Sequence, residues 1–280
     1  MRINVKMPNS NGVAAGQTAT FDLPIGRRFH ALQLEYSGIT LAQMTEIRII
    51  ANGEPIHRYS GTQRDVMNQF DGRAAAAGIL IIPFDRFNLY EQVGEQATAL
   101  QTGSAGPDGI AVTSLKMEID IDAAAAAPAI ACSALQSDND PAAPGPGRSV
   151  LRVLPYSRVL GAGQAEISDL PKSTEGPKFL FVNRAFFFNG ADITRARVER
   201  SGFTIFERSK ALNDRAQLDG VRSPQAGLYV IDPTEEGYDY ETIALVQPNK
   251  LPHQDFRYVL TLSAGATVVP VIEYIGVLGG

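Results

Sequence analysis

The chain is poor in the residues that most often bind metals and sugars: of its 280 residues none is tryptophan, one is cysteine and three are histidine. The lone Cys132 excludes an intrachain disulfide, which is typical of a protein that folds in a reducing cytosol. His30, His57 and His253 do not have the spacing of a metal-binding motif. Because tryptophan is the usual aromatic platform for a sugar ring, its absence argues against a lectin-like site.

Catalytic signatures and long apolar runs are also missing. The chain has no G-x-S-x-G elbow, and the segment Gly161-Ala162-Gly163-Gln164 lacks the lysine and the spacing of a phosphate-binding loop. Residues 1–8 contain no continuous apolar stretch of the kind found in signal peptides. The apolar run 123–135 is interrupted by Pro128 and is too short to cross a bilayer. We therefore expect no enzyme, no leader and no membrane-spanning segment.

The charge balance is slightly acidic. The formal net charge is −5 and the isoelectric point is about 5.3, which disfavours a general nucleic-acid coat because such a coat needs a basic surface. Arg195, Arg197, Arg200 and Arg208 gather in the second half. At strand spacing Arg195 and Arg197 share one face, so an exposed sheet face or an interface is favoured over a nucleic-acid groove.

The most informative feature present is an internal repeat. Five segments recur in the same order: Asp22-Leu23-Pro24 as Asp169-Leu170-Pro171, Gly53-x-x-Ile56 as Gly202-x-x-Ile205, Ser60 as Ser209, Gln69-Phe70-Asp71-Gly72 as Gln217-Leu218-Asp219-Gly220, and Gly78-Ile79-Leu80-Ile81-Ile82 as Gly227-Leu228-Tyr229-Val230-Ile231. The spacing of roughly 148 residues is far longer than a solenoid repeat and has the size of a whole domain. The chain therefore consists of two similar domains in tandem.

Short strand-like segments fill both halves, punctuated by 26 glycines and 17 prolines. We expect strands at 32–36, 46–50, 78–83, 112–122, 179–182, 186–188, 204–206, 228–231, 243–246, 258–262 and 268–278. Seven or eight short strands per half, with turns about every ten residues, favour an all-β fold of two tandem eight-stranded antiparallel jelly rolls, a double jelly roll. Greek-key sandwiches of other kinds stay open.

Helical signals are few and short. Residues 62–65 have the pattern of a capping box and predict a helix start, segment 209–218 predicts a matching helix in the second copy, and 87–100 has room for a third. Residues 137–147 have three prolines, two glycines and no apolar periodicity, as expected of a semi-extended linker. The predicted division is an N-terminal roll at 1–137, a linker at 138–148 and a C-terminal roll at 149–280.

One strand carries a row of carboxylates. In segment 112–122 apolar and charged residues alternate, so Glu118, Asp120 and Asp122 share a face. Three carboxylates in a row repel one another unless water, basic partners or a hard cation offset the charge. Three alternatives follow: a solvated strand face, an ion-paired contact with a neighbouring subunit, or a calcium site. The acids Glu235, Glu236, Asp239 and Glu241 are a weaker candidate of the same kind, without EF-hand spacing.

Several ordered segments resemble the major capsid protein of corticovirus-type phages, which are tailless icosahedral bacteriophages with a membrane beneath the protein shell. The segments are 13–16 with 23–26, Leu34-Glu35-Tyr36-Ser37-Gly38-Ile39-Thr40, Ile119-Asp120-Ile121-Asp122-Ala123-Ala124-Ala125, Glu166-Ile167-Ser168-Asp169-Leu170-Pro171, and Ile272-Glu273-Tyr274-Ile275-Gly276-Val277. They span the whole chain, whereas the stretches 84–109 and 221–253 differ from the family.

The resemblance implies a double jelly roll that forms a homotrimer. Three chains with two similar rolls each would make a pseudo-hexagonal capsomer, and such capsomers tile an icosahedral shell over an internal membrane. The implied partners are the chain itself, neighbouring capsomers, vertex or spike proteins and membrane-associated virion proteins, without direct nucleic-acid contact. The implied location is the virion, assembled in the host cytoplasm. No cofactor is required, although members of the family rely on divalent cations, which favours calcium on the acidic strand.

Two other functions fit a pair of jelly rolls. A tandem carbohydrate-binding module would ordinarily use tryptophan as its sugar platform, and this chain has none. A glycan-removing amidase would favour a secretory signal and disulfides, which the sequence does not predict. We therefore expect a structural capsid subunit.

Overall fold

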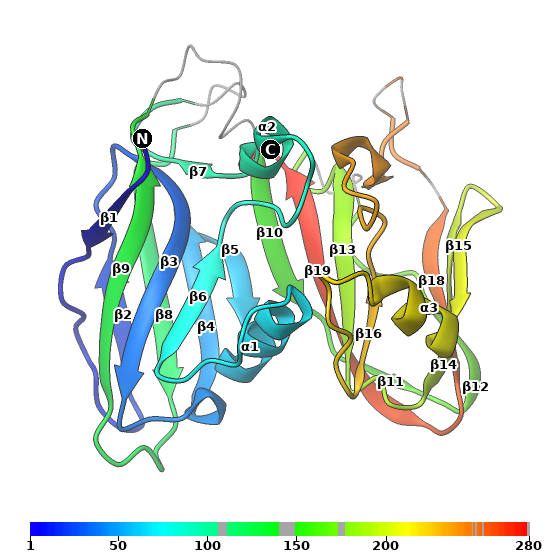
Figure 1. The fold of residues 1–280 in the computed structure, drawn as a ribbon, viewed down its shortest axis with the longest axis horizontal. Helices are drawn as coiled ribbons and strands as arrows, with labels where there is room; N and C mark the ends of the chain where they lie inside the picture. The colour runs from blue at the N-terminus through cyan, green and yellow to red at the C-terminus, as the bar shows by residue number, and fades with distance from the viewer. Residues whose placement is uncertain are drawn as a thin grey trace.

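The computed structural model describes residues 1–105, 111–139, 149–172, 177–247, 249, 251–253 and 255–278. Its strands form three sheets, arranged as two rolls side by side (Figure 1). No helix among these residues has the length and apolar character needed to cross a bilayer.

The N-terminal roll packs two antiparallel sheets against each other. The outer sheet has the order β1-β9-β3-β6, with β7 beside β3, and the facing strands have the order β2-β8-β4-β5. The bounds are β1 (Ile3–Lys6), β2 (Thr18–Asp22), β3 (Arg28–Ser37), β4 (Met44–Ala51), β5 (Glu54–Tyr59), β6 (Ile79–Pro83), β7 (Leu100–Gln101), β8 (Leu115–Ile121) and β9 (Ala129–Ser137), with α1 (Gly61–Phe70), α2 (Gln92–Gln96) and the 3-10 turn η1 (Leu41–Gln43).

The C-terminal roll repeats this plan. Its inner strands have the order β10-β19-β13-β16, and its outer sheet has the order β12-β18-β14-β15. The bounds are β10 (Val150–Pro155), β11 (Arg158–Leu160), β12 (Gly163–Ile167), β13 (Phe181–Phe188), β14 (Ile193–Arg200), β15 (Phe203–Ser209), β16 (Leu228–Ile231), β17 (Ile243–Ala244), β18 (Phe256–Leu262) and β19 (Ala266–Gly276), with α3 (Lys210–Gln217) and the 3-10 turn η3 (Asp239–Glu241).

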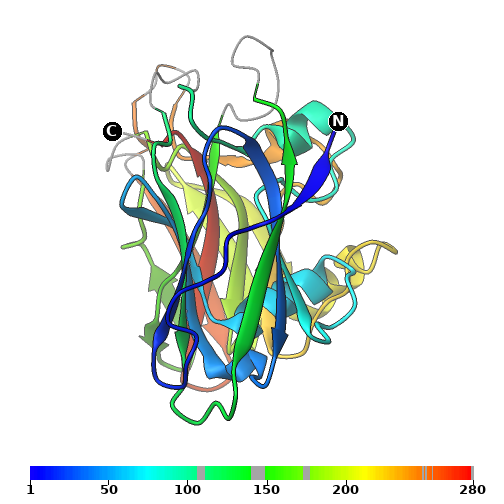
Figure 2. The same cartoon turned by 90° about the vertical axis from the view of Figure 1, so that its left-hand side faces the viewer.

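The two rolls share one sheet. Strand β10 runs parallel to β5, with Val153 opposite His57, so the inner strands of both rolls form a continuous ten-stranded sheet. The larger hydrophobic core also crosses the boundary, because Phe186 of the second roll packs edge-on against Phe70 of the first with ring centroids 5.7 Å apart. The rolls are therefore fused through backbone pairing and packing (Figures 1 and 2).

The sequence repeat corresponds to a structural repeat. Gly53 and Gly202 both lie in the left-handed region, at φ of 81° and 79°, where glycine is favoured in tight hairpin turns. Ser60 and Ser209 are both helix N-caps: each side-chain oxygen accepts a hydrogen bond from the backbone N–H three residues ahead. Helices α1 and α3 lie on the same side of the molecule (Figure 2).

The helices contact equivalent strands through equivalent bonds. In the first roll Asn68 Nδ2 donates to the carbonyl oxygen of Ile81 at 2.9 Å. In the second roll Gln217 Nε2 donates to the carbonyl oxygen of Val230 at 3.0 Å. Each bond satisfies a backbone acceptor of the strand that follows the helix, and so fixes the helix against the inner sheet.

Several expectations about local structure need correction. The capping box is formed by Ser60 and Gln63 and not by residues 62–65, since the helix already begins at Gly61. Residues 181–182 and 186–188 belong to one strand, β13, which is mostly buried and begins after residues 179 and 180. The strands that were not among the expected segments are β1, β2, β5, β7, β9, β10, β11, β12 and β14. Positions 140–148 of the proposed linker lie outside the described residues.

Candidate functional site: charged clusters and outer surfaces

The carboxylates of the acidic strand β8 have a basic partner within the chain. Arg48 on β4 lies directly opposite Glu118 in the antiparallel register. Its Nη1 is 2.7 Å from Asp120 Oδ2, its Nε donates to Glu118 Oε2 at 3.1 Å, and it also pairs with Glu46. Thr18 Oγ1 donates to Asp120 Oδ1 at 2.7 Å. The hydrogen bonds from Arg48 lower the pKa of Asp120, so this carboxylate is charged at neutral pH.

Asp122 is separate from this cluster. It follows the end of β8, and its Oδ1 accepts a hydrogen bond from the backbone N–H of Ala124 at 2.7 Å. Within the described part of the chain, no group of three His, Cys, Asp or Glu side chains is placed to hold a metal ion. Arg48 was missed by the sequence reasoning; the alternation of Glu46 and Arg48 on a neighbouring strand was the available signal. Calcium binding by Glu118, Asp120 and Asp122 stays a prediction.

One histidine lies in a hydrogen-bond chain that has the composition of a catalytic triad. Both oxygens of Asp85 lie 3.0 Å from His30 Nδ1, and Ser137 Oγ lies 2.8 Å from His30 Nε2. Arg2 also donates to Asp85 at 2.8 Å. Ser137 is not among the residues that line the adjacent cavity, although His30 and Asp85 are. We therefore interpret the chain of bonds as structural: it ties the segment that leads into β1 to the ends of β3 and β9.

The other two histidines are structural as well. His57 is fully buried, and burial lowers its pKa to about 3, so the ring is neutral. Its Nε2 donates to the carbonyl oxygen of Leu151 at 3.1 Å, which adds a side-chain bond to the β5–β10 junction. His253 contacts Ser201 Oγ at 2.9 Å through Nδ1. Cys132 is buried, and burial raises the pKa of its thiol to about 12, which makes it unreactive.

A buried ion-pair network lies where the two rolls meet. Arg184 on β13 forms two hydrogen bonds with Glu273 on β19, at 2.8 and 2.9 Å, and one with Asp71 of the first roll at 2.5 Å. Asn183 Nδ2 donates to Glu273 at 2.7 Å. Burial disfavours the charge on Arg184, but Asp71 and Glu273 outweigh it and raise its pKa. The network therefore ties the rolls together with charges that are almost inaccessible to water.

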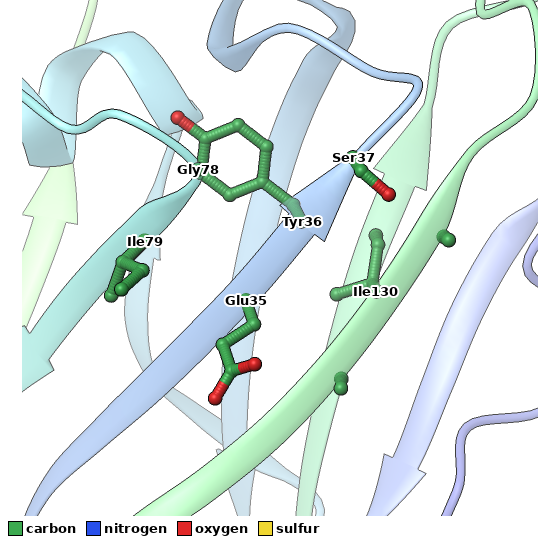
Figure 3. Close-up of a pocket in the computed structure, with 8 residues that line it drawn as sticks. Glu35, Tyr36, Ser37, Gly78, Ile79 and Ile130 are labelled. Carbon is green, nitrogen blue, oxygen red and sulfur yellow. The ribbon is translucent and has the colours of Figure 1, made fainter.

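The outer face of the N-terminal roll has a shallow groove with little charge. The groove has a volume of about 430 Å³ and runs across β6, β3 and β9 (Figure 3). Ile79, 53% exposed, lies in it, and Glu35 is its one charged lining residue. The lining is Glu35, Tyr36, Ser37, Gly78, Ile79, Ala129, Ile130 and Ala131. Exposed apolar surface of this kind is typical of a contact surface.

The outer sheet of the C-terminal roll is different. Its arginines form surface ion pairs, with Arg195 at 2.8 Å from Glu207 and Arg197 at 2.7 Å from Glu199. Such pairing leaves little basic surface for nucleic acid. The sheet ends at the edge strand β15, where Phe203 is 74% exposed. An uncovered edge strand with an exposed aromatic residue is a ready template for contact with another chain.

The weaker acidic candidate lies beside this edge. Glu235, Glu236 and Glu241 line a cavity of about 390 Å³ together with Arg200 and Arg208. Glu235 is paired with both terminal nitrogens of Arg208. The cluster is therefore of mixed charge, and among the described residues its acids form no group placed to hold a metal ion.

Comparison with known proteins agrees with this architecture. The family model described as "Viral coat protein P2 N-terminal domain" matches residues 4–137, and the one described as "Viral coat protein P2 C-terminal domain" matches residues 150–278. The chain is 26% identical to "Major capsid protein P2" of Pseudoalteromonas phage PM2, over 99% of this chain and 98% of that protein.

Solved structures give the same fold. The crystal structure of the major capsid protein P2 from bacteriophage PM2 has a TM-score of 0.86 and 24% identity, covering 100% of this chain and 98% of that one. A chain in the atomic structure of Sulfolobus Turreted Icosahedral Virus has a TM-score of 0.67 and 13% identity, covering 99% of this chain and 91% of that one.

The two rolls define a double jelly-roll fold, and the two family models identify a coat protein, which is a structural protein. Because the two family models together match most of its length, the chain belongs to the viral coat protein P2 family. The expected fold class and the family resemblance are thereby confirmed.

Proposed function

We propose that this protein is the major capsid protein of a tailless, membrane-containing icosahedral phage, and that it forms homotrimers. The observation that carries the proposal is the full-length similarity to the capsid protein of phage PM2, in sequence and in fold. It is supported by the repeat, since two similar rolls in each of three chains give six similar units around a threefold axis. Such a capsomer is pseudo-hexagonal and can tile a flat facet.

Rigid fusion of the two rolls suits this role. A capsomer keeps its outline only if the angle between its rolls is fixed. The ten-stranded sheet and the Arg184 network both cross the boundary between the rolls. Both features hold that angle without help from a partner. We accordingly propose the division into rolls at 1–137 and 149–280 with a linker at 138–148, as two folded units that act as one body.

The contacts between copies are proposed for two surfaces. In a closed threefold ring the interface is heterologous, so each chain presents two different faces. The groove around Ile79 and the edge strand with Phe203 are the exposed apolar features of the two outer sheets. We propose that these features are covered by other copies of the chain, within a trimer or between trimers. Vertex and membrane-associated proteins are the further proposed partners, and the virion the proposed location.

A calcium ion at the acidic strand is part of the proposal only in the assembled state. Arg48 already offsets Glu118 and Asp120 within one chain, and Asp122 is bonded to the backbone. A cation there would need additional oxygen ligands, because Ca²⁺ takes six to eight. In a shell, a neighbouring copy is the available source of such ligands.

The test is the mass and shape of the purified protein. Light scattering coupled to gel filtration should give a trimer of about 90 kDa, three times the 30.1 kDa chain. Electron micrographs of the particles should show pseudo-hexagonal capsomers. A chain that stays monomeric at high concentration, or particles without such capsomers, would overturn the proposal.

A further inference from the structure

A cavity of about 110 Å³ lies beside the ion-pair network that joins the rolls. Its lining residues come from both rolls: the charged ones are Arg2, Asp71, Arg73, Asp85 and Arg86 from the first, and Arg184 and Glu273 from the second, with His30 also present. The cavity has room for several waters or for one small ion. It is distinct from the outer grooves because most of these charged side chains are buried.

The charges around the cavity do not balance. Four arginines face three carboxylates, and two of the arginines are already paired: Arg2 with Asp85, and Arg184 with Asp71 and Glu273. Arg73 and Arg86 form no ion pair with any described residue. All three carboxylates that line the cavity are thus already engaged by arginines.

Arg86 is the more unusual of the two unpaired arginines. It is only 7% exposed, and the groups that accept its hydrogen bonds are neutral: Nε donates to Asn183 Oδ1 at 2.9 Å and Nη2 donates to the carbonyl oxygen of Asp239 at 3.3 Å. Burial lowers its pKa. The nearby carboxylates of Asp239 and Glu273 offset this burial only in part, and a buried charge without a directly paired carboxylate is costly.

A further buried guanidinium, that of Arg64, lies near Asp71, which lines the cavity. Arg64 is 1% exposed, its Nε has no hydrogen-bond partner, and its nearest carboxylate, on Asp71, is 3.9 Å away. Asp71 is closer to Arg184. The whole junction therefore has a surplus of buried positive charge next to an open space.

We propose that this cavity binds a small inorganic oxyanion of the phosphate class. Arg86 holds it from the inner wall, and the exposed Arg73 holds it at the mouth. Planar guanidinium groups recognise the oxygens of such anions through paired, charge-assisted hydrogen bonds. Since the cavity is lined by both rolls, the anion supplies the missing negative charge and stabilises their junction.

The test measures the binding of inorganic phosphate to the whole protein, both by calorimetry and by the change in melting temperature. The wild type should bind one phosphate per chain in a saturable manner and should melt at a higher temperature when loaded. Arg73→Gln should weaken binding at least tenfold, because it removes a charge-assisted contact, and should leave the melting temperature without phosphate unchanged. Arg73 is exposed and forms no ion pair with the residues that the structure describes, so this variant folds.

Arg215→Gln is the matched control. Arg215 is an exposed arginine on α3 that forms no ion pair within the described residues, and its loss changes the net charge equally. It should bind phosphate as the wild type does. If all three proteins respond equally to phosphate, the proposal is overturned. It is also overturned if phosphate and chloride have equal effects at matched ionic strength, because the effect is then general screening. Because the mass of the trimer is measured separately, failure here leaves the capsid proposal standing.

Discussion

The two rolls agree in their turns and helix caps and differ on their outer surfaces. The N-terminal roll presents a nearly uncharged groove around Ile79, whereas the C-terminal roll presents arginine–glutamate pairs that end in the exposed Phe203. Turns and caps are dictated by the backbone that both rolls share. Outer faces are free to diverge, and in the proposed threefold ring one face of each chain meets a different face of the next.

The junction between the rolls is the part that neither copy could supply alone. Asp71 comes from the first roll, and Arg184 and Glu273 come from the second. We therefore expect substitutions in the buried junction to lower the free energy of unfolding more than substitutions on the solvated outer faces.

The largest effect should come from breaking the buried network. Arg184→Met removes the hydrogen-bonded partner of both Asp71 and Glu273, and breaking a buried ion pair by removing one partner costs about 3–5 kcal/mol. The matched control is Arg195→Met, which breaks an exposed pair worth less than about 1 kcal/mol. Urea unfolding of both variants measures the free energies. A cost for Arg184→Met as small as that of the control would show that the network does not hold the rolls together.

The sequence predicts the parts of the fold that depend on local pattern. In β8 the alternating residues Leu115, Met117, Ile119 and Ile121 are buried as expected, because a half-buried strand has a period of two. Strand β9 escaped prediction because its residues include several alanines and serines of low strand propensity. Strand β5 escaped because it carries Glu54, Pro55 and Arg58.

The charged sites were less accessible to sequence reasoning than the strands. Arg184 lies 113 residues from Asp71 and 89 from Glu273, so their meeting depends on the packing of the rolls and on no local motif. The acidic strand was visible because its three residues share one period-two pattern. Its partner Arg48 could not be predicted in the same way, because the pairing of β4 with β8 decides that Arg48 lies opposite Glu118.

An intermediate effect should distinguish the two helix-to-strand bonds. Asn68→Ala leaves the Ile81 carbonyl without its side-chain donor and also removes the acceptor of Arg64 Nη2, at 3.0 Å. Gln217→Ala is milder, because Asn213 still donates to the Val230 carbonyl at 2.7 Å. We expect costs of about 2–3 kcal/mol for the first and about 1 kcal/mol for the second.

Chemical denaturation measures both costs in the same protein background. Equal costs would mean that the two copies are energetically equivalent at this position despite their different partners. A larger cost for Gln217→Ala would reverse the comparison and show that the second roll relies more on its helix than the first does.

The smallest effect should be found at the acidic strand. The lowered pKa of Asp120 means that its pairing with Arg48 contributes stability above the pKa of the unfolded state and loses it as the pH falls. Because Asp120 and Arg48 are only partly buried, Asp120→Asn should cost no more than about 1 kcal/mol at neutral pH and almost nothing once the carboxylate is protonated. If calcium also bridges copies here, a chelator should lower the melting temperature of assembled wild-type particles, and added calcium should restore it. Asp122→Asn particles should then respond less to the chelator, since they lack one ligand but keep the Arg48 cluster. If the chelator leaves the melting temperature of the particles unchanged, calcium does not bind at the acidic strand, and Arg48 is the counterion of its carboxylates.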